Sequence, residues 1–216
     1  MSNLKDEMQP VAKRVYGKKN AEDRESERRE RLLQAALQLF ATQGYANTTI
    51  EGLCSEAKVT ARHFYEVFRG REAVLLALYN QMMEELQAGL LASIMTEHSS
   101  LHEKMREIVQ ALVSLYLTDT RRAKIGVLEV VGVSPAIEHR RREVIHTISM
   151  YIQLFLDQLA SQNEIPQRNY HWLTVAIVGG MNELMAEWLM NPNLSLEELT
   201  EEMIFIAERM LGINTV

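Results

Sequence analysis

Residues that interrupt helices are scarce in this sequence, which has only four prolines and ten glycines among its 216 residues. A proline inside a helix costs about 3 kcal/mol, so a chain with so few prolines can form long helices. The apolar residues recur at a helical period almost throughout. We therefore expect an all-α protein of about nine helices, divided into one small and one larger domain.

Three further absences narrow the class of protein. The single cysteine, Cys54, cannot form a disulfide framework and is expected to be a small core residue. No run of about 18 uncharged apolar residues occurs, so no helix is expected to span a membrane. The charged N-terminus lacks the apolar core of a secretory signal. These absences predict a cytoplasmic protein with no membrane partner.

The net charge of −6 is unevenly distributed along the chain. Residues 1 to 71 hold 13 Lys and Arg against 10 Asp and Glu, a net charge of +3. Residues 72 to 216 hold 10 Lys and Arg against 19 Asp and Glu, a net charge of −9. Affinity for a phosphate backbone depends on local charge, so only the first part is suited to nucleic acid. An imbalance of this size is also ordinary for a protein surface and carries little weight alone.

The segment TIEGLCSEAKVTARHFYEVF, residues 49 to 68, predicts two short helices joined by a tight turn. The turn falls at Lys58-Val59, and Thr60 is placed to N-cap the second helix. The second helix has Phe64, Val67 and Phe68 on one face, and its opposite face presents Ala61, Arg62, His63, Tyr65 and Glu66. Two helices of this length form a helix-turn-helix, whose second helix fits the DNA major groove.

The residues around this unit resemble the TetR family of bacterial transcription regulators. The resemblance begins at ERRERLLQAALQLFATQGYANTTI, residues 27 to 50, and continues through VTARHFYEVFRGREAVLLALY, residues 59 to 79. The matching positions are Thr60, the pair Phe64-Tyr65, Phe68 and the step Arg71-Glu72. Lys58 departs from the family, which usually has Gly there. A lysine in the left-handed conformation costs about 1 kcal/mol.

The resemblance implies three regions. Residues 1–25 are expected to be a basic, flexible extension, residues 26–71 a three-helix DNA-binding head, and residues 72–216 a helical effector-binding and dimerisation domain. The first helix of the head is expected from about Ser26 to Gln43. The extension is interpreted either as a solvated tail or as a basic arm that follows the DNA.

Candidate DNA contacts follow from residue chemistry and from the resemblance. Arg62 is the first candidate for reading a base, because a guanidinium can bind guanine O6 and N7 together. The other candidates for base contact are His63 and Ala61, and those for phosphate contact are Thr49, Thr60, Tyr65 and Arg71. Thr60 has the alternative of serving only as a helix cap, and Tyr65 that of packing within the head. Thr48 is expected to cap the second helix of the head.

The last two helices, expected to end near Met190 and Met210, carry apolar residues on more than one face. The resemblance implies that they pair with their copies in a second subunit as a four-helix bundle. Candidate interface residues are Met181, Trp188, Met203, Ile206 and Met210. The alternative is a helix pair buried within one chain.

The resemblance also implies a small-molecule effector, apolar or amphipathic, bound in the larger domain. Candidate pocket residues are Tyr116, Glu129, His146, Met150 and Asn182. The function predicted is that of a homodimeric repressor, released by the ligand from a palindromic operator in double-stranded DNA. One alternative is a regulator without a small effector.

A second alternative is a helical-bundle metalloenzyme. Glu143-x-x-His146 supplies half of a di-iron site, but such a site needs two of these pairs and two more glutamates. No second pair, no Gly-rich phosphate loop and no GxSxG motif occurs in the sequence. We therefore expect no catalytic residues, no metal and no cofactor.

Overall fold

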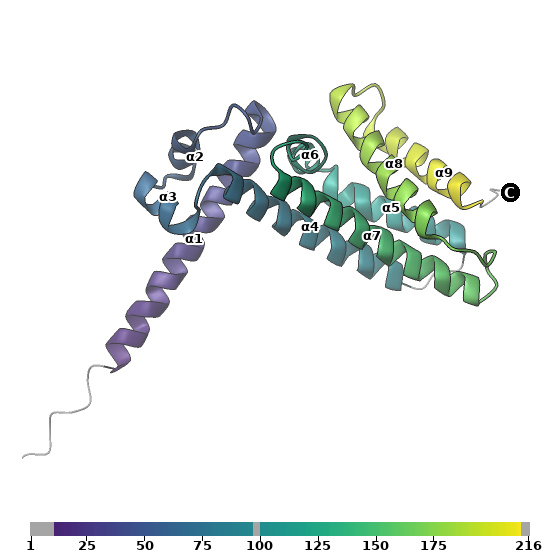
Figure 1. The fold of residues 1–216 in the computed structure, drawn as a ribbon, viewed down its shortest axis with the longest axis horizontal. Helices are drawn as coiled ribbons and strands as arrows, with labels where there is room; N and C mark the ends of the chain where they lie inside the picture. Colours follow the sequence, from purple (N-terminus) through teal and green to yellow (C-terminus); the bar gives the residue numbers. More distant parts are fainter. Residues whose placement is uncertain (1–10, 97–99, 213–216) are drawn as a thin grey trace, which may run out of the picture.

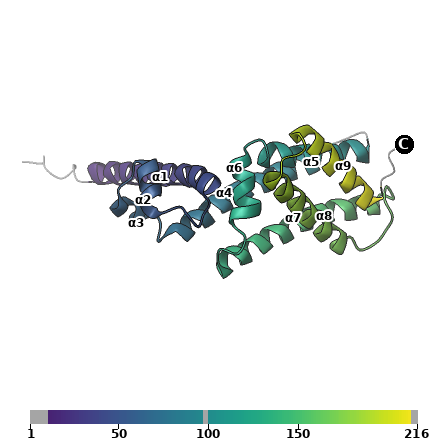
Figure 2. The same cartoon turned by 90° about the horizontal axis from the view of Figure 1, so that it is seen from above.

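The computed structural model describes residues 11–96 and 100–212, and over these ranges every regular element is a helix. This confirms the all-α class and the order of a three-helix head followed by a helical body. Figure 1 shows the head, helices α1 to α3, at one end of the elongated molecule, and Figure 2 shows the same arrangement from above. None of the helices in the described ranges is long and apolar enough to cross a membrane.

The head consists of α1 (Val11–Gln43), α2 (Ile50–Ala57) and α3 (Ala61–Val67). Its core is formed by apolar side chains from all three helices, with Leu32, Phe40, Leu53 and Phe64 fully buried. Gly44 ends α1 with φ +83°, a conformation that glycine adopts without strain.

Helix α1 begins at Val11, whereas the first helix of the head was expected to begin near Ser26. The sequence pattern misled because this stretch has no apolar period. A helix needs only residues of high helix propensity, and Ala, Lys, Glu and Arg dominate here. The remaining residues of the predicted extension, 1–10, lie outside the described part of the chain.

The body contains α4 (Arg71–Met95), α5 (Leu101–Tyr116), α6 (Thr120–Lys124), α7 (Pro135–Ser161), α8 (His171–Met190) and α9 (Leu196–Leu211). Helix α4 packs against α1 in the head and against α5 and α7 in the body, so it joins the two domains. Ser100, Ser134 and Ser195 are the N-caps of α5, α7 and α9, and their side chains each accept a backbone N–H of the first turn.

The helical segment between α5 and α7 is not a regular α-helix. Five α-helical residues, Thr120–Lys124, are followed by five residues in π-helical form, η1 (Ile125–Glu129). The segment ends at Gly132 with φ +70°, as glycine at that position predicts. A π-helical turn is rare and is frequently found at functional sites.

Candidate nucleic-acid interface

Helix α2 is held in place by two neighbouring threonines with different roles. The Thr49 hydroxyl accepts the Gly52 N–H at 3.0 Å, so Thr49 is the N-cap. The predicted cap, Thr48, is fully buried, and its hydroxyl donates to the Gly44 carbonyl at 2.9 Å. The cap assignment is therefore corrected from Thr48 to Thr49, because Thr48 already uses its hydroxyl to close the end of α1.

The turn between α2 and α3 is made by Lys58 in the left-handed conformation, with φ +54° and ψ +44°. The Lys58 N–H donates to the Ser55 carbonyl, and the Val59 N–H donates to the Cys54 carbonyl at 3.0 Å. Val59 is buried against the head core, which fixes the direction in which the chain enters α3. The turn geometry is thus the one in which glycine is preferred, although lysine occupies it.

Replacing Lys58 with glycine is expected to stabilise the protein by about 0.5–1 kcal/mol, because the left-handed conformation is unstrained for glycine. The measurement is the free energy of unfolding in urea. Lys58→Ala is the control, since it removes the charge and keeps the Cβ atom. Equal stability of the glycine and alanine variants would contradict the account.

Helix α3 is anchored by its inner face and exposed on its outer face. Thr60 caps it, accepting the His63 N–H at 3.3 Å, and Phe64 is completely buried. On the outer face the Arg62 side chain is 87% exposed, and Tyr65 is 60% exposed with its ring edge-on to Phe64. Figure 1 shows α3 at the edge of the head, away from the body. The helix is therefore rigidly held and open to a large partner.

A carboxylate, Glu66, organises the basic side chains of this outer face. Its oxygens lie 3.4 Å from Arg62 Nε, 3.8 Å from Arg28 Nη1 and 4.0 Å from His63 Nε2. Exposed ion pairs of this kind contribute at most about 1 kcal/mol, so a phosphate or a base can replace them. Arg28 comes from α1, and the sequence pattern did not identify it because only the fold brings it to α3.

Arg71, predicted to contact phosphate, has partners within the head. Its guanidinium donates to the Ala46 carbonyl at 3.2 Å and to the Thr48 carbonyl, and it lies 4.4 Å from the centroid of the Tyr45 ring. These contacts tie the start of α4 to the α1–α2 connection. The geometry favours a structural role for Arg71, and its phosphate contact stays a prediction.

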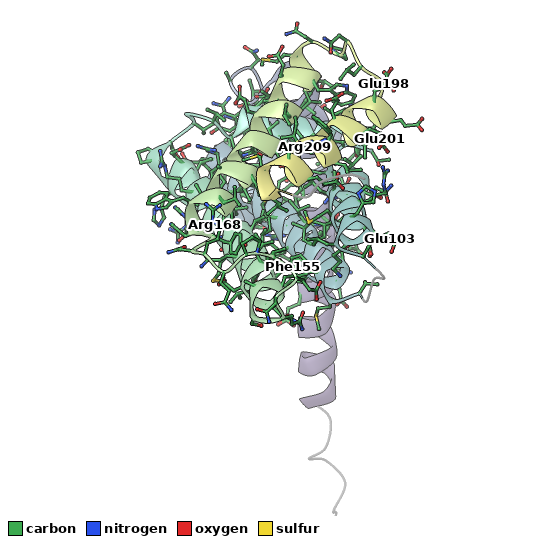
Figure 3. The ribbon with its side chains drawn as sticks, turned by 90° about the vertical axis from the view of Figure 1, so that its right-hand side faces the viewer. Glu103, Phe155, Arg168, Glu198, Glu201 and Arg209 are labelled. Carbon is green, nitrogen blue, oxygen red and sulfur yellow. The ribbon has the colours of Figure 1, made fainter. Side chains whose placement is uncertain are left out.

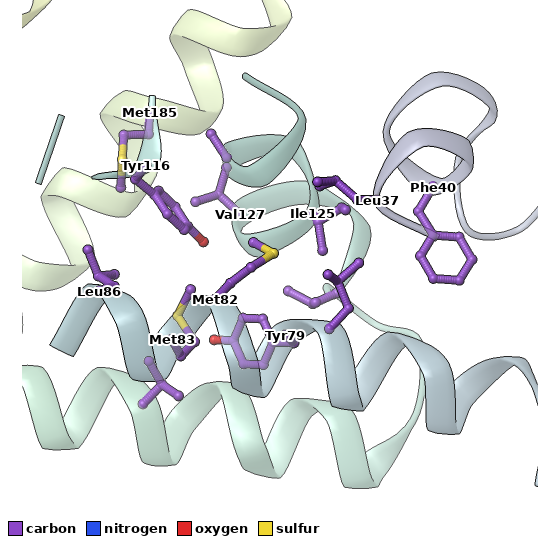
Figure 4. Packing of buried hydrophobic residues seen from close by; sticks show 14 of the residues in the cluster. Leu37, Phe40, Tyr79, Met82, Met83, Leu86, Tyr116, Ile125, Val127 and Met185 are labelled. Carbon is purple, nitrogen blue, oxygen red and sulfur yellow. The ribbon is translucent and has the colours of Figure 1, made fainter. Parts of the chain in front are cut away.

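The body contains an apolar cavity of about 90 Å³ between α4, α5, α7 and α8. Tyr79 and Tyr116, both labelled in Figure 4, line this cavity, and the Tyr116 hydroxyl lies against Gly126 of η1. Burial raises the pKa of Tyr79 to about 12 and the pKa of Tyr116 well above its usual value, so both hydroxyls keep their protons. The cavity thus offers hydrogen-bond donors at one end of an apolar space.

The five predicted pocket residues are distributed over three places. Tyr116 and Asn182 line the cavity. His146 and Met150 are exposed on α7, and the assignment is corrected because successive helix residues point about 100° apart. The face of α7 toward the cavity carries the neighbouring residues Ile145, Ile148 and Ile152 instead. Tyr79 was not predicted, since a tyrosine within an apolar stripe is indistinguishable from core.

Glu129, the remaining predicted pocket residue, lies at the junction between body and head. Its carboxylate accepts the Tyr45 N–H at 2.6 Å, just beyond the end of α1. Glu129 is the last residue of η1, whose second residue, Gly126, lines the cavity against the Tyr116 hydroxyl. The pocket assignment of Glu129 is therefore corrected to a contact between the two domains, which the sequence alone could not place.

The predicted dimer residues are likewise divided. Met181 and Met203 are buried within the chain, so they are withdrawn as interface residues. The other three, Trp188, Ile206 and Met210, are partly buried against the same core. Helices α8 and α9 pack on each other, which leaves a different outer face, seen in Figure 3. On α8, Trp172 is 76% exposed, and Gly179 and Gly180 have open space where a side chain would be.

The Glu143-His146 pair considered as half of a metal site is not formed. Glu143 instead pairs with His139 at 3.2 Å and with Arg140 at 3.3 Å. Within residues 11–96 and 100–212, no three His, Cys, Asp or Glu side chains are grouped as metal ligands would be.

Comparison with known proteins agrees with this geometry. Residues 32–78 match the family model for bacterial regulatory proteins of the tetR family. Over 52 residues the chain is 38% identical to YerO, an uncharacterized HTH-type transcriptional regulator of Bacillus subtilis. That alignment covers 24% of this chain and 18% of YerO, so the chain spans about a fifth of this relative's length.

Two solved structures match nearly the whole chain in fold. One is the fatty acid degradation regulator FadR from Bacillus halodurans, with a TM-score of 0.76, 19% identity and coverage of 86% of this chain and 95% of that one. The other is FadR from Bacillus subtilis in complex with stearoyl-CoA, with a TM-score of 0.74, 19% identity and coverage of 86% and 99%. At this identity the neighbours establish a shared fold.

A capped and exposed second helix on a small helical head, joined to a helical body, defines a helix-turn-helix DNA-binding protein. The family match adds that this head is of the tetR kind. Over residues 32–78 the chain is similar to the tetR family of bacterial regulatory proteins, and the curated relative YerO is an HTH-type transcriptional regulator.

Proposed function

We propose that this chain is a homodimeric repressor that binds a pseudo-palindromic operator and is released by a small apolar or amphipathic ligand. The observation that carries the proposal is α3, whose inner face is anchored by Phe64 and whose outer face presents Arg62 and Tyr65 to solvent. Such a helix inserts its N-terminal residues into the major groove. A regulator that acts on bacterial DNA works in the cytoplasm, and that location is part of the proposal.

The residues of the head divide into two proposed roles. Arg62 reads a guanine, with His63 and Ala61 beside it on the first turn of α3. The two capping threonines, Thr49 and Thr60, and the Tyr65 hydroxyl face outward and position the phosphates. The cap function of Thr60 uses its oxygen as an acceptor, so its hydroxyl proton remains for a phosphate or for His63 Nδ1, 3.0 Å away.

The proposed effector binds in the apolar cavity. The solved FadR complex contains stearoyl-CoA, which supports a ligand with a long apolar part. The cavity of about 90 Å³ is smaller than usual ligand pockets, which hold about 300–1,000 Å³. A ligand must therefore widen it, and the flexible side chains of Met83, Met105, Met181 and Met185 around it repack readily. Because the ligand binds only the widened state, it shifts the protein toward that state.

Widening of the cavity is proposed to change the position of the head through η1. The Tyr116 hydroxyl lies against Gly126, and Glu129 at the end of the same π-helical turn binds the Tyr45 N–H. Movement of Tyr116 by a ligand displaces this turn and weakens the Glu129 contact. The two heads of a dimer then lose the spacing of about one DNA turn that a two-fold operator requires.

The proposed dimer is formed by the outer face of α8 and α9. Trp172, Ala176, Gly179 and Gly180 recur at helical spacing along α8 and are all exposed. A Cβ atom at Gly179 or Gly180 would meet nothing within 4 Å in the same chain. Glycine in a helix interior costs about 1 kcal/mol relative to alanine, and small residues allow another helix to come close.

Gly180→Leu is expected to convert the dimer to a monomer, because the new side chain occupies the space of the partner helix. The measurement is the molar mass in solution by sedimentation equilibrium. The matched control is Gln110→Leu, which adds the same side chain at an exposed position of α5. An unchanged dimer in the Gly180 variant would show that α8 is not the interface.

A regulator without a small effector is the second candidate, favoured by the small size of the cavity. Such a protein would be controlled by a partner protein or by its abundance. It would bind its operator with the same affinity in the presence and absence of apolar ligands.

A further inference from the structure

A second hollow, a polar groove of about 700 Å³, adjoins the apolar cavity at the end of the body farthest from the head. It lies between the C-terminal ends of α4 and α7 and the N-terminal end of α5. Ile94 and Phe155 line both hollows, so they form the wall between groove and cavity. Figure 3 faces this end of the molecule, with Phe155 labelled on α7. A ligand in the cavity therefore has a polar exit to solvent beside Phe155.

The apolar lining of the cavity extends over a long part of α4. The lining on α4 extends from Tyr79 to Ile94, and a helix rises 1.5 Å per residue, so the lining spans about 22 Å. The polar groups of the two hollows differ in kind. The cavity has two tyrosine hydroxyls and the Asn182 amide, whereas the groove at the opposite end has an ammonium, a carboxylate, amides and hydroxyls.

Lys104 is the buried cation of the groove, with 5% of its surface exposed. Its Nζ donates to the Ser93 carbonyl at 2.6 Å and to the Thr96 carbonyl, and it lies 5.8 Å from the centroid of the Phe155 ring. Burial lowers the pKa of Lys104, and the charge of Glu107 opposes this shift. An ammonium has three donors, so one remains after the two carbonyls are bound.

A buried charge is stable only when it is compensated, and Lys104 has two neutral carbonyls and the charge of Glu107 as partners within the chain. A ligand anion in the groove would complete the set of partners. The carboxylate that lines the groove, Glu164, is exposed to solvent, so its repulsion of an anion is screened.

We infer that the effector is an amphipathic anion, whose apolar chain lies in the cavity and whose carboxylate or phosphate lies in the groove, bound by Lys104. This inference rests on the proposed function and adds the charge of the ligand and the place of its head group. Two sources have this chemistry, namely a free long-chain carboxylate and an acyl thioester with a phosphorylated carrier. Phe155 separates the chain from the head group.

The test compares ligands that share one apolar chain and differ in charge. Stearate, stearoyl-CoA and neutral stearyl alcohol are titrated into the full-length protein without DNA, and binding is measured by calorimetry. An anionic head group that accepts a charge-assisted hydrogen bond is expected to bind about tenfold tighter than the alcohol, or more. A preference for one of the two anions identifies the natural head group, and either preference supports the inference.

Two variants locate the charge. Lys104→Met removes the ammonium and is expected to abolish the difference between the anions and the alcohol. Gln158→Glu places a negative charge in the groove, leaves the hydrogen bonds of Lys104 intact and is expected to weaken anion binding alone. The matched control is Gln110→Glu, an exposed position of α5 outside the groove. If the Lys104→Met variant does not fold, the Gln158→Glu variant still tests whether the head group of the ligand lies in the groove.

The outcomes separate the inference from the proposed function. Equal binding of alcohol and anions, or an equal loss of both in the variants, overturns the inference and leaves an apolar effector in place. Absence of binding by all three ligands overturns the inference as well. Release of selected operator DNA by stearyl alcohol, measured separately, tests the proposed function without reference to charge.

Discussion

Arg62→Ala is expected to relax the sequence preference at one base pair in each half of the operator. The Arg62 side chain is 87% exposed on the first turn of α3 and is oriented by Glu66, 3.4 Å from its Nε. A bidentate contact of a guanidinium with guanine discriminates against other bases by about 1–3 kcal/mol. A dimer loses this contact twice, so the effect on the whole operator is roughly double.

The measurement is the affinity of wild-type and variant protein for operators in which each base pair is changed in turn. Arg69→Ala is the matched control, because Arg69 is exposed in the connection after α3 and not on the reading helix. Arg69→Ala is expected to weaken binding to all operator sequences by the same factor. It is also expected to reduce the dependence of affinity on salt concentration. A uniform loss for Arg62→Ala would instead assign Arg62 to a phosphate.

Gly126→Ala is expected to have the largest effect within the body. A Cβ atom at this position would lie 1.3 Å from the Tyr116 hydroxyl, so Tyr116 or the π-helical turn must move. Such overpacking costs about 1–3 kcal/mol. Because Glu129 of the same turn binds the Tyr45 N–H, the displacement is also expected to weaken operator binding without any ligand.

The measurement is the free energy of unfolding together with operator affinity. Gly126→Ala combined with Tyr116→Leu is the matched control, since the shorter side chain vacates the space that the new methyl group needs. The double variant is expected to recover operator affinity. If it binds as weakly as Gly126→Ala alone, the contact between Tyr116 and Gly126 does not control the head.

Much of the helix-turn-helix could be predicted from the sequence because its signals are local. Thr60 caps the helix that follows it, Gly44 ends the helix that precedes it, and Phe64 recurs at helical spacing with Phe68. The left-handed turn at Lys58 was predicted only through the family resemblance, and the structure contains it. Interactions of this kind involve residues within a few positions of each other, so the pattern records them.

The contacts between the two domains could not be predicted from the sequence, because they join residues that are far apart in the chain. Glu129 and Tyr45 are 84 positions apart, and no pattern around either one predicts their hydrogen bond. Whether Met181 and Met203 lie in the core or at a subunit interface depends on how α8 and α9 pack against each other. The start of α1 was missed for another reason, since helix propensity without an apolar period gives no signal of amphipathicity.

If α3 reads DNA as one of a two-fold pair, the purified protein is expected to select an inverted repeat from the native genome. The experiment is selection of genomic fragments near physiological salt, followed by sequencing of the bound DNA. The half-sites of the enriched repeat are expected to lie about one helical turn apart or somewhat more. No enrichment by protein refolded from denaturant, which has lost any co-purified ligand, would contradict this expectation.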